Sequence, residues 1–427
     1  MIKCIQIRKL FGRFNYNISM NSTGVTIITG PNGFGKSTLL RTINALSSGD
    51  IGFFMKLDFF ELIVLFDNGK SLAIQKSNKS IRVDEVSIPL FNEKQLAFLQ
   101  RQPRTQINNS TDWKNSDTLP DYESVMNYFI EYRYSFGDIA LKEKDRQALQ
   151  KIKKKLELVK GWCGDVRFIS DQRLIRTEQR QSGSSKGQEV VDVIRELPKR
   201  LKSKISKVSE EYSRVANTLD GSYPKRLFAA QIGIKNQSDY ELRLKEANEK
   251  FEKLRKYNLV DISIINEEKY NESYSTALKI YFDDFAEKFK VFQDLISKLD
   301  LFTKIVNSRL TFKHLRITRE NGFEIVDNDN PEKVLRLSQL SSGEKQEIVL
   351  FYELIFDSGN NLFLLIDEPE ISLHITWQKQ FLNDLLEVSK LIQLRAIVAT
   401  HSPQIVSNHL DIQIDLGELY GKELNTQ

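Results

Sequence analysis

Residues 30–38 read Gly-Pro-Asn-Gly-Phe-Gly-Lys-Ser-Thr, and this stretch decides the fold. It fits the pattern G-x-x-x-x-G-K-[ST] and lies between an apolar, β-branched run at residues 25–29 and a helical pattern that begins at Leu39. In such a strand–loop–helix unit the glycines let backbone N–H groups turn inward around a phosphate, and the helix N-terminus adds its positive end. The sequence therefore predicts an α/β core with a nucleoside triphosphate site.

Side chains at the end of this loop complete the predicted site. We expect Lys36 to neutralise the β- and γ-phosphate oxygens and Ser37 to offer its hydroxyl to Mg²⁺. A nucleoside triphosphate and Mg²⁺ are therefore the predicted ligands, and the family resemblance described below implies that the nucleotide is ATP. The other loop residues expected to contact the nucleotide are Asn32, Gly33, Gly35 and Thr38.

A second motif follows an apolar run at residues 362–366, which is typical of a buried parallel strand. The run ends in Asp367, which is placed to hold the Mg²⁺ shell, and Glu368, which is placed to polarise the attacking water. Two adjacent carboxylates at the end of a strand indicate hydrolysis as well as binding. Solvated acids at a strand end are the alternative interpretation.

A third predicted strand, residues 396–399, runs into Thr400-His401-Ser402. Because polar groups at the ends of parallel strands converge, we expect His401 to hydrogen-bond a γ-phosphate oxygen or the attacking water. A structural role at the end of the strand is the alternative for this histidine.

The motif Leu-Ser-Ser-Gly-Glu at residues 340–344 completes the set. The order of the four motifs resembles the ABC-type ATPase superfamily, including its SMC and RecF branches. The resemblance implies that Ser341, Ser342 and Gly343 contact a nucleotide held by a second subunit, so that at least two chains must meet. It also implies a Mg²⁺-sensing glutamine after an early strand, and Gln172 is the candidate.

Two segments depart from the commonest pattern of that superfamily. The signature reads Ser-Ser-Gly-Glu rather than Ser-Gly-Gly-Gln, and residues 370–374 read Glu-Ile-Ser-Leu-His where transporters usually carry an Asp. Both variants look like soluble prokaryotic ATPases of the superfamily. We expect His374 to lie at the dimer contact or to be structural.

The N-terminal third is rich in strand patterns. Alternating apolar residues and turn residues such as Asp67-Asn68-Gly69-Lys70 predict five strands, at residues 2–7, 15–18, 25–29, 59–66 and 72–75. Residues 102–121 are polar without periodicity and predict a loop.

Helical patterns dominate the middle of the chain. Two heptad-like stretches, residues 201–219 and 240–254, predict a short antiparallel hairpin. We expect Gly221 and Pro224 to end the first helix. An aromatic stripe along residues 270–299 is expected in the core or at a subunit interface rather than in a ligand groove.

Strand patterns return at residues 310–318 and 323–326, shortly before the Ser341 motif. The fold class is therefore predicted as α/β: an ABC-type ATPase head, with a mixed N-terminal sheet and a parallel P-loop core, interrupted by a helical hairpin. The expected domains are the N-terminal half of the head at residues 1–180, the helical insertion at 181–300 and the C-terminal half at 301–427.

Composition favours a cytoplasmic enzyme. The 427 residues are 40% hydrophobic and 28% charged, which suggests a composite domain with an insertion. No apolar run approaches the roughly 18 residues that span a bilayer, and the first residues lack a secretory apolar core. The two cysteines, Cys4 and Cys163, predict neither a disulfide framework nor a metal site.

Charge is uneven along the chain. The net charge is +5, but residues 141–207 carry 19 Lys and Arg against 9 Asp and Glu. Such a segment can attract a polyanion, so DNA contact is one interpretation. A solvated helix face is the other, since acidic residues alternate with the lysines.

The short length of the insertion indicates which subfamily of the superfamily the chain resembles. Together with residues 10–16, Leu-Phe-Gly-Arg-Phe-Asn-Tyr, and 219–226, Leu-Asp-Gly-Ser-Tyr-Pro-Lys-Arg, it resembles the ATPase subunits of bacterial anti-phage systems. The AriA family of PARIS is most similar, with the PtuA family of Septu as a sibling. The resemblance implies an oligomeric sensor and scaffold that controls a separate effector, a Toprim-like nuclease, in response to a phage product or damaged DNA.

Two other functions remain open. One is a RecF- or SMC-like ATPase that acts on DNA in repair or recombination. The other is an ATP-gated scaffold with negligible turnover.

Overall fold

The computed structural model describes residues 1–90, 143–169, 175–179, 188–230, 232–260, 270–359, 362–371, 373 and 375–424. The predicted loop at 102–121 and the predicted site residues Gln172 and His374 lie outside these ranges. The chain forms two compact units, Met1–Asp171 with Gly359–Gln427, and Gln172–Ser358. Residues 301–358 therefore pack with the helical unit, whereas the division into three functional domains stays a prediction.

The first unit contains a parallel sheet that carries the P-loop. Its strand order is β16-β3-β15-β14-β8, and every neighbouring pair is parallel. The apolar run before Asp367 forms a central strand whose first five residues are buried, as predicted. The strands are β3 (Val25–Thr29), β8 (Asp165–Ile169), β14 (Leu362–Asp367), β15 (Arg395–Ala399) and β16 (Gln413–Asp415).

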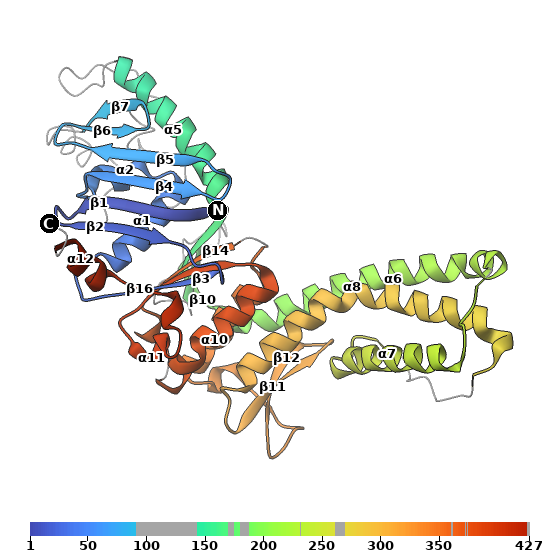
Figure 1. Cartoon of the computed structure of the whole chain (residues 1–427). Coiled ribbons are helices and arrows are strands. Elements are labelled where there is room, and N and C mark those ends of the chain that lie inside the picture. Colours follow the sequence, from blue (N-terminus) through green and yellow to red (C-terminus); the bar gives the residue numbers. More distant parts are fainter. Residues whose placement is uncertain are drawn as a thin grey trace, which may run out of the picture. The chain divides into compact units, whose positions relative to one another are not determined.

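A six-stranded antiparallel sheet forms the other layer of this unit (Figure 1). Its order is β2-β1-β4-β5-β6-β7, so the predicted α/β head with a parallel P-loop core is confirmed, but its N-terminal sheet is antiparallel throughout rather than mixed. The last two strands were not predicted, because each has only four residues. The strands are β1 (Ile2–Leu10), β2 (Phe14–Ser19), β4 (Glu61–Phe66), β5 (Ser71–Lys76), β6 (Ser80–Val83) and β7 (Val86–Pro89).

Helix α1 (Lys36–Ser48) connects the two layers. It packs on β8, β14 and β15 and also contacts α2 and α5. Leu40 and Leu46 of this helix are fully buried in a core cluster that includes both sheets. The P-loop at its N-terminus therefore rests on a rigid scaffold. The other helical segments of the unit are α2 (Ile51–Lys56), α5 (Glu143–Cys163), α10 (Ile375–Ile392), α11 (Pro403–Val406), α12 (Leu416–Leu424), η5 (Pro369–Ile371) and η6 (Leu410–Ile412).

The second unit is dominated by an arm of three helices, α6 (Leu197–Ala229), α7 (Gln237–Lys256) and α8 (Ser275–Asn307) (Figure 1). The insertion is confirmed, but its pairing is not that of the predicted hairpin. Helix α6 runs antiparallel to α8, since Tyr212 stacks near Phe292 at 5.2 Å between ring centroids and Arg226 pairs with Asp284. Helix α7 also packs on α8, where its Phe251 ring stacks on Phe285 at 4.1 Å.

The prediction that Gly221 and Pro224 end the first helix is wrong, because α6 continues through both residues to Ala229. Arg226 explains the continuation. Its Nη2 donates to the Leu219 carbonyl at 2.8 Å, and its guanidinium pairs with Asp284 of α8 through contacts of 2.5 and 2.7 Å. Tertiary contacts thus offset the cost of a proline inside a helix.

The aromatic stripe of α8 lies mainly in the arm's core, as predicted: Phe285, Phe289, Phe292 and Leu299 are buried. Tyr274 and Tyr281 are exposed. Among the described residues, no helix is long and apolar enough to cross a membrane.

The base of the second unit carries the Ser341 motif at the start of α9 (Ser342–Phe356). A three-stranded sheet precedes it, as the strand patterns at 310–318 and 323–326 predicted. The remaining elements are β9 (Ile175–Gln179), β10 (Gln188–Asp192), β11 (Lys313–Thr318), β12 (Gly322–Asp327), β13 (Val334–Leu335), η2 (Val193–Arg195), η3 (Glu272–Tyr274) and η4 (Leu337–Gln339).

Candidate nucleotide site

The P-loop joins β3 to α1 through a backbone that only glycine adopts easily. Gly30, Gly33 and Gly35 have φ values of 140°, 83° and 90°. A Cβ on Gly35 would lie 2.8 Å from Leu10 Cδ2, so this position lacks room for a side chain as well. The loop can therefore bring its N–H groups close to an anion at the N-terminus of α1.

Lys36 folds back over this loop. Its Nζ donates to the carbonyl oxygens of Gly30 at 2.9 Å and Pro31 at 3.3 Å, and the residue is only 5% exposed. Burial lowers the pKa of Lys36, and the carboxylates of Glu368 and Asp367 oppose that shift. The arrangement suits a cation that binds phosphate oxygens.

The two metal-ligand candidates that the structure describes lie together. Ser37 Oγ donates to Asp367 Oδ1 at 3.1 Å, although 330 positions separate them in the sequence. In the described ranges, no group of three or more His, Cys, Asp and Glu side chains forms a metal cage by itself. A hydroxyl beside one carboxylate fits Mg²⁺, which usually takes few protein ligands and completes its shell with phosphates and water.

Glu368 and His401 face each other next to Lys36. His401 Nε2 lies 3.8 Å from Glu368 Oε1, and His401 Nδ1 lies 3.4 Å from Lys36 Nζ. Glu368 has a left-handed backbone with φ 46°, and its N–H donates to the Ala399 carbonyl at 2.9 Å. Such a conformation costs roughly 1–3 kcal/mol outside glycine and is frequent at active sites. The structure thus brings both predicted catalytic side chains to the P-loop.

The remaining predicted P-loop contacts follow the loop and the first turn of α1. Asn32 and Gly33 are exposed, and Thr38 is half-buried with its carbonyl accepting a hydrogen bond from Thr42 Oγ1. Their roles toward a nucleotide stay predictions.

Phe11 was missed by the sequence reasoning. Its ring atom Cε2 lies 3.4 Å from where a Cβ on Gly35 would sit, and the residue is 39% exposed. Its backbone is left-handed, with φ 54°, which places the ring at the β1–β2 turn. The signal available in the sequence was an aromatic residue directly before Gly12, between two strand patterns.

A segment near residue 415 also supports the P-loop and was missed. Asp415 Oδ2 accepts a hydrogen bond from Thr29 Oγ1 at 2.8 Å, and its Oδ1 accepts from the Gly417 N–H at the start of α12. The Tyr420 ring on α12 lies 6.0 Å from Phe34 of the loop and 5.1 Å from Phe14. We call residues 413–420 the P-loop brace.

The Ser341 turn, residues 341–343, belongs to the second unit. Ser341 caps α9: its Oγ accepts from the Glu344 N–H at 3.2 Å, and Glu344 Oε2 accepts from the Ser341 N–H at 2.8 Å. Ser341 and Ser342 are exposed and Gly343 is half-buried. The turn therefore presents a helix N-terminus at a surface, which favours binding of an anion.

A buried ion pair lies beneath this turn. Arg309 Nε is 3.2 Å from Glu347 Oε2, and each side chain is 3% exposed. Lys313 of β11 also pairs with Glu344 at 3.1 Å. The first turns of α9 are thereby fixed to the segment that follows α8.

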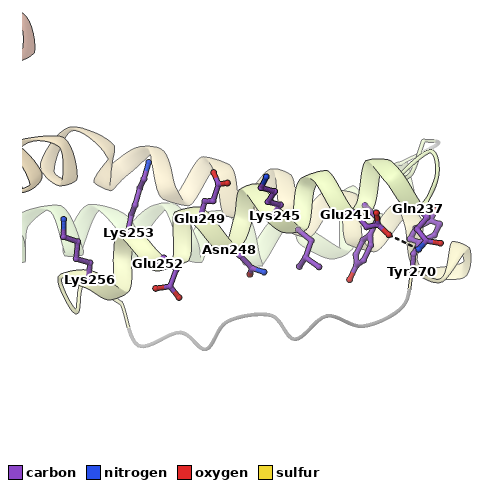
Figure 2. A pocket seen from close by; sticks show the side chains of 11 residues that line it. Gln237, Glu241, Lys245, Asn248, Glu249, Glu252, Lys253, Lys256 and Tyr270 are labelled. Carbon is purple, nitrogen blue, oxygen red and sulfur yellow. Dashed lines mark hydrogen bonds between the residues drawn. The ribbon is translucent and has the colours of Figure 1, made fainter.

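A groove of about 1190 Å³ runs along α7 and has a different character (Figure 2). Figure 2 shows Lys245 and Lys253 alternating with Glu241 and Glu249 along the helix. None of the residues predicted to contact the nucleotide lines this groove, and the mixed charges of its lining do not favour binding of a polyphosphate.

Comparisons with known proteins agree with the site. Residues 1–406 match the family model described as AAA ATPase domain. The oligopeptide transport ATP-binding protein OppD of Bacillus subtilis (strain 168) is 30% identical over 134 residues, which are 28% of this chain and 36% of that protein. This chain thus spans about a third of that relative's length.

Two solved structures resemble the chain at low scores. A crystal structure of the SmcHead bound to the C-winged helix domain of ScpA has a TM-score of 0.36 and 12% identity, covering 95% of this chain and 90% of that one. The SMC head domain from Thermotoga maritima has a TM-score of 0.32 and 11% identity, covering 95% and 92%. These likenesses carry no argument about function. The family match spans nearly the whole sequence and both halves of the P-loop site, and the chain therefore belongs to the AAA ATPase domain family.

Proposed function

We propose that this ATPase is the oligomeric sensor and scaffold subunit of a bacterial anti-phage defence system, in which it controls a separate effector nuclease. One observation carries the proposal: the Lys36, Asp367, Glu368 and His401 side chains converge on the P-loop, whereas the capped Ser341 turn is exposed on a different unit. Two copies could share a nucleotide if the P-loop site of one copy bound it and the exposed Ser341 turn of the other copy covered its γ-phosphate.

The hydrolytic step follows from the side chains around the P-loop. Lys36 would neutralise the terminal phosphates, and Glu368 would accept the proton of the attacking water. His401, within 3.8 Å of Glu368 and 3.4 Å of Lys36, would hydrogen-bond the γ-phosphate or that water. Mg²⁺ held by Ser37 and Asp367 would neutralise charge on the β- and γ-phosphates.

Phe11 extends the site beyond the phosphates. Its exposed ring beside Gly35 offers a flat apolar face on which an adenine base can stack. This contact would favour nucleotides over inorganic phosphates.

Oligomerisation would follow from the Ser341 turn. Backbone N–H groups at the start of α9, with the exposed hydroxyls of Ser341 and Ser342, would bind the γ-phosphate on another copy. ATP would then stabilise the closed assembly, and hydrolysis would weaken it, because the ligand favours the state in which it makes more contacts.

The defence role is supported by the resemblance of residues 10–16 and 219–226 to anti-phage ATPases. Arg226 of the second stretch fixes α6 to α8, so the arm is a stiff element that can transmit a change at its base. A phage protein would act as the trigger that releases the effector.

Two measurements test the proposal. Light scattering of wild-type protein and Glu368→Gln should show a higher mass with ATP and Mg²⁺ than with ADP, and a monomer under both conditions would contradict it. The chain should also be expressed with its native neighbouring genes in a bacterial host challenged with phage. Plaque formation should drop with the wild type and recover with Lys36→Ala.

A RecF- or SMC-like role on DNA is the second candidate. It is favoured by α5, whose Lys151, Lys154 and Lys160 are exposed. If it holds, duplex DNA should bind with a steep salt dependence that Lys151→Ala/Lys154→Ala reduces, and the phage assay should show no protection.

A further inference from the structure

Glu370 follows Asp367 and Glu368 closely in the sequence, but its carboxylate binds residues 400–402 rather than residues of the P-loop. Its Oε1 accepts hydrogen bonds from Thr400 Oγ1 at 2.8 Å, the His401 N–H at 2.7 Å and the Ser402 N–H at 3.2 Å. One carboxylate oxygen thus holds three consecutive residues, which we call the His turn (Thr400–Ser402). Hydrogen bonds to an ionised acceptor are shorter and stronger than neutral ones.

A second side chain completes this attachment from α10. Gln378 Nε2 donates to the carbonyls of Glu370 at 3.3 Å and Leu373 at 3.1 Å, and its Oε1 accepts from Ser402 Oγ at 2.8 Å. The segment after β14 and the His turn after β15 are therefore linked twice, through Glu370 and through Gln378.

Other hydrogen bonds hold the two ends of the His turn, Thr400 and Ser402. Thr400 is fully buried and its N–H donates to the Ile28 carbonyl at 3.1 Å, while the Ser402 N–H also reaches Thr400 Oγ1 at 2.9 Å. The His401 N–H has Glu370 as its acceptor. Without that carboxylate the turn would lose the acceptor that orients the residue carrying the imidazole.

We propose that Glu370 is a positioning residue for ATP hydrolysis, which acts by holding His401 between Lys36 and Glu368. The inference rests on the role of His401 in the proposed function. Glu370 does not contact the reacting atoms in this scheme, because its Oε1 is engaged by the three hydrogen bonds from the His turn.

The chemistry of Glu370 predicts a graded series of variants. Glu370→Gln keeps an oxygen that can accept the same hydrogen bonds, so it should retain most of the turnover. Glu370→Ala removes the acceptor and should lower kcat about 10- to 100-fold, less than the roughly 100- to 10,000-fold of a lost general acid or base because His401 itself is kept, with KM for ATP changed less than about threefold. Glu320→Ala, which removes an exposed acid from the β11–β12 turn, is the matched control and should leave kcat unchanged.

A double-mutant cycle separates positioning from an independent role. If Glu370 acts through His401, the Glu370→Ala/His401→Ala double variant should be within about twofold of His401→Ala, since non-additivity reports a shared pathway. A double variant whose loss is the product of the two single losses would overturn the inference. So would Glu370→Gln turning over as slowly as Glu368→Gln, because that result would indicate a chemical role.

Failure of the two proposals can be told apart. Wild-type kcat in His401→Ala would remove the role of His401 and this inference with it, whereas a slow His401→Ala beside a fast Glu370→Ala would overturn this inference alone. If Glu370→Ala does not fold, Gln378→Met breaks the second link, and the same cycle with His401→Ala applies.

A spectroscopic readout completes the test. The chain has four histidines, so the ring signals of ¹³C-histidine protein can be resolved and the His401 signal assigned by its loss in His401→Ala. Glu370→Ala should shift or broaden that signal and leave the His409 signal in place. An unchanged His401 signal would contradict positioning.

Discussion

The P-loop and the Ser341 turn both present a helix N-terminus to an anion, but they are built in opposite ways. The P-loop is supported by distant segments: Lys36 is 5% exposed, Asp415 bonds Thr29 just before the loop, and Tyr420 packs on Phe34 within it. The Ser341 turn is exposed and holds its shape through a local capping box. We therefore predict that a nucleotide binds the P-loop of a single chain, and that the Ser341 turn contributes only when a second copy covers it.

The largest expected effect comes from a substitution in the P-loop. Lys36→Ala should weaken ATP binding by at least about 100-fold, because it removes a buried cation and with it a charge-assisted contact worth about 1.5–3 kcal/mol plus local order of the loop. Titration calorimetry with a non-hydrolysable ATP analogue measures this. Lys79→Ala, an exposed lysine in the β5–β6 turn, should bind normally. Tight binding in Lys36→Ala would contradict the phosphate role.

Glu368→Gln should stop turnover while binding survives. The amide cannot accept the proton of the attacking water, so we expect kcat to fall by about 100-fold or more with ATP affinity within about threefold. Single-turnover hydrolysis and calorimetry separate the two quantities. Normal kcat in this variant would refute the assigned base, whereas negligible hydrolysis in both the wild type and Glu368→Gln would favour the scaffold.

Ser341→Arg tests the role of the exposed Ser341 turn. It should leave ATP affinity unchanged but lower hydrolysis by about 10-fold or more, since a bulky side chain at the N-cap blocks approach of a second copy. Mixing it with Lys36→Ala should restore part of the activity if sites are shared between chains. Glu320→Arg adds the same side chain at an exposed turn of the same unit and is the control.

The P-loop brace predicts a smaller effect. Tyr420→Ala removes the ring contacts to Phe14 and Phe34, each worth about 0.5–1.5 kcal/mol beyond burial, so KM for ATP should rise about three- to tenfold. Steady-state kinetics and thermal unfolding should both report the change. An unaltered KM would show that the loop keeps its shape without α12.

The smallest effect concerns the cap itself. Glu344→Ala removes the reciprocal half of the capping box and should lower the free energy of unfolding of its unit by about 1 kcal/mol while ATP binding at the P-loop stays the same. Denaturant unfolding monitors the first quantity. A matching loss of ATP affinity would mean that nucleotide binding at the P-loop depends on the stability of the Ser341 turn.

Much of the parallel core was predictable because its signals are local. The P-loop pattern, the apolar run before Asp367 and the short strand before Thr400 each specify a strand and its polar end within a few residues. The roles of Lys36, Glu368 and His401 stay predictions, but their convergence is what parallel strand ends impose.

The misses share a physical cause, which is dependence on distant contacts. Pro224 lies inside α6 because Arg226 reaches Asp284, 58 positions away. The P-loop brace depends on a hydrogen bond between Thr29 and Asp415, which are 386 positions apart. The local periodicity of the sequence shows neither contact, and for this reason it predicts a helix end at the proline.

The order of the parallel sheet has a consequence for how the protein is made. Strand β3 leaves the ribosome early, yet both of its neighbours, β15 and β16, come from residues 395–415. A nascent chain therefore holds an apolar strand with two unpaired edges until residues 395–415 have been made, and unpaired edges invite wrong pairing. Chaperone binding to the newly made chain should accordingly persist past residue 360 and cease only after residue 415 has left the ribosome tunnel.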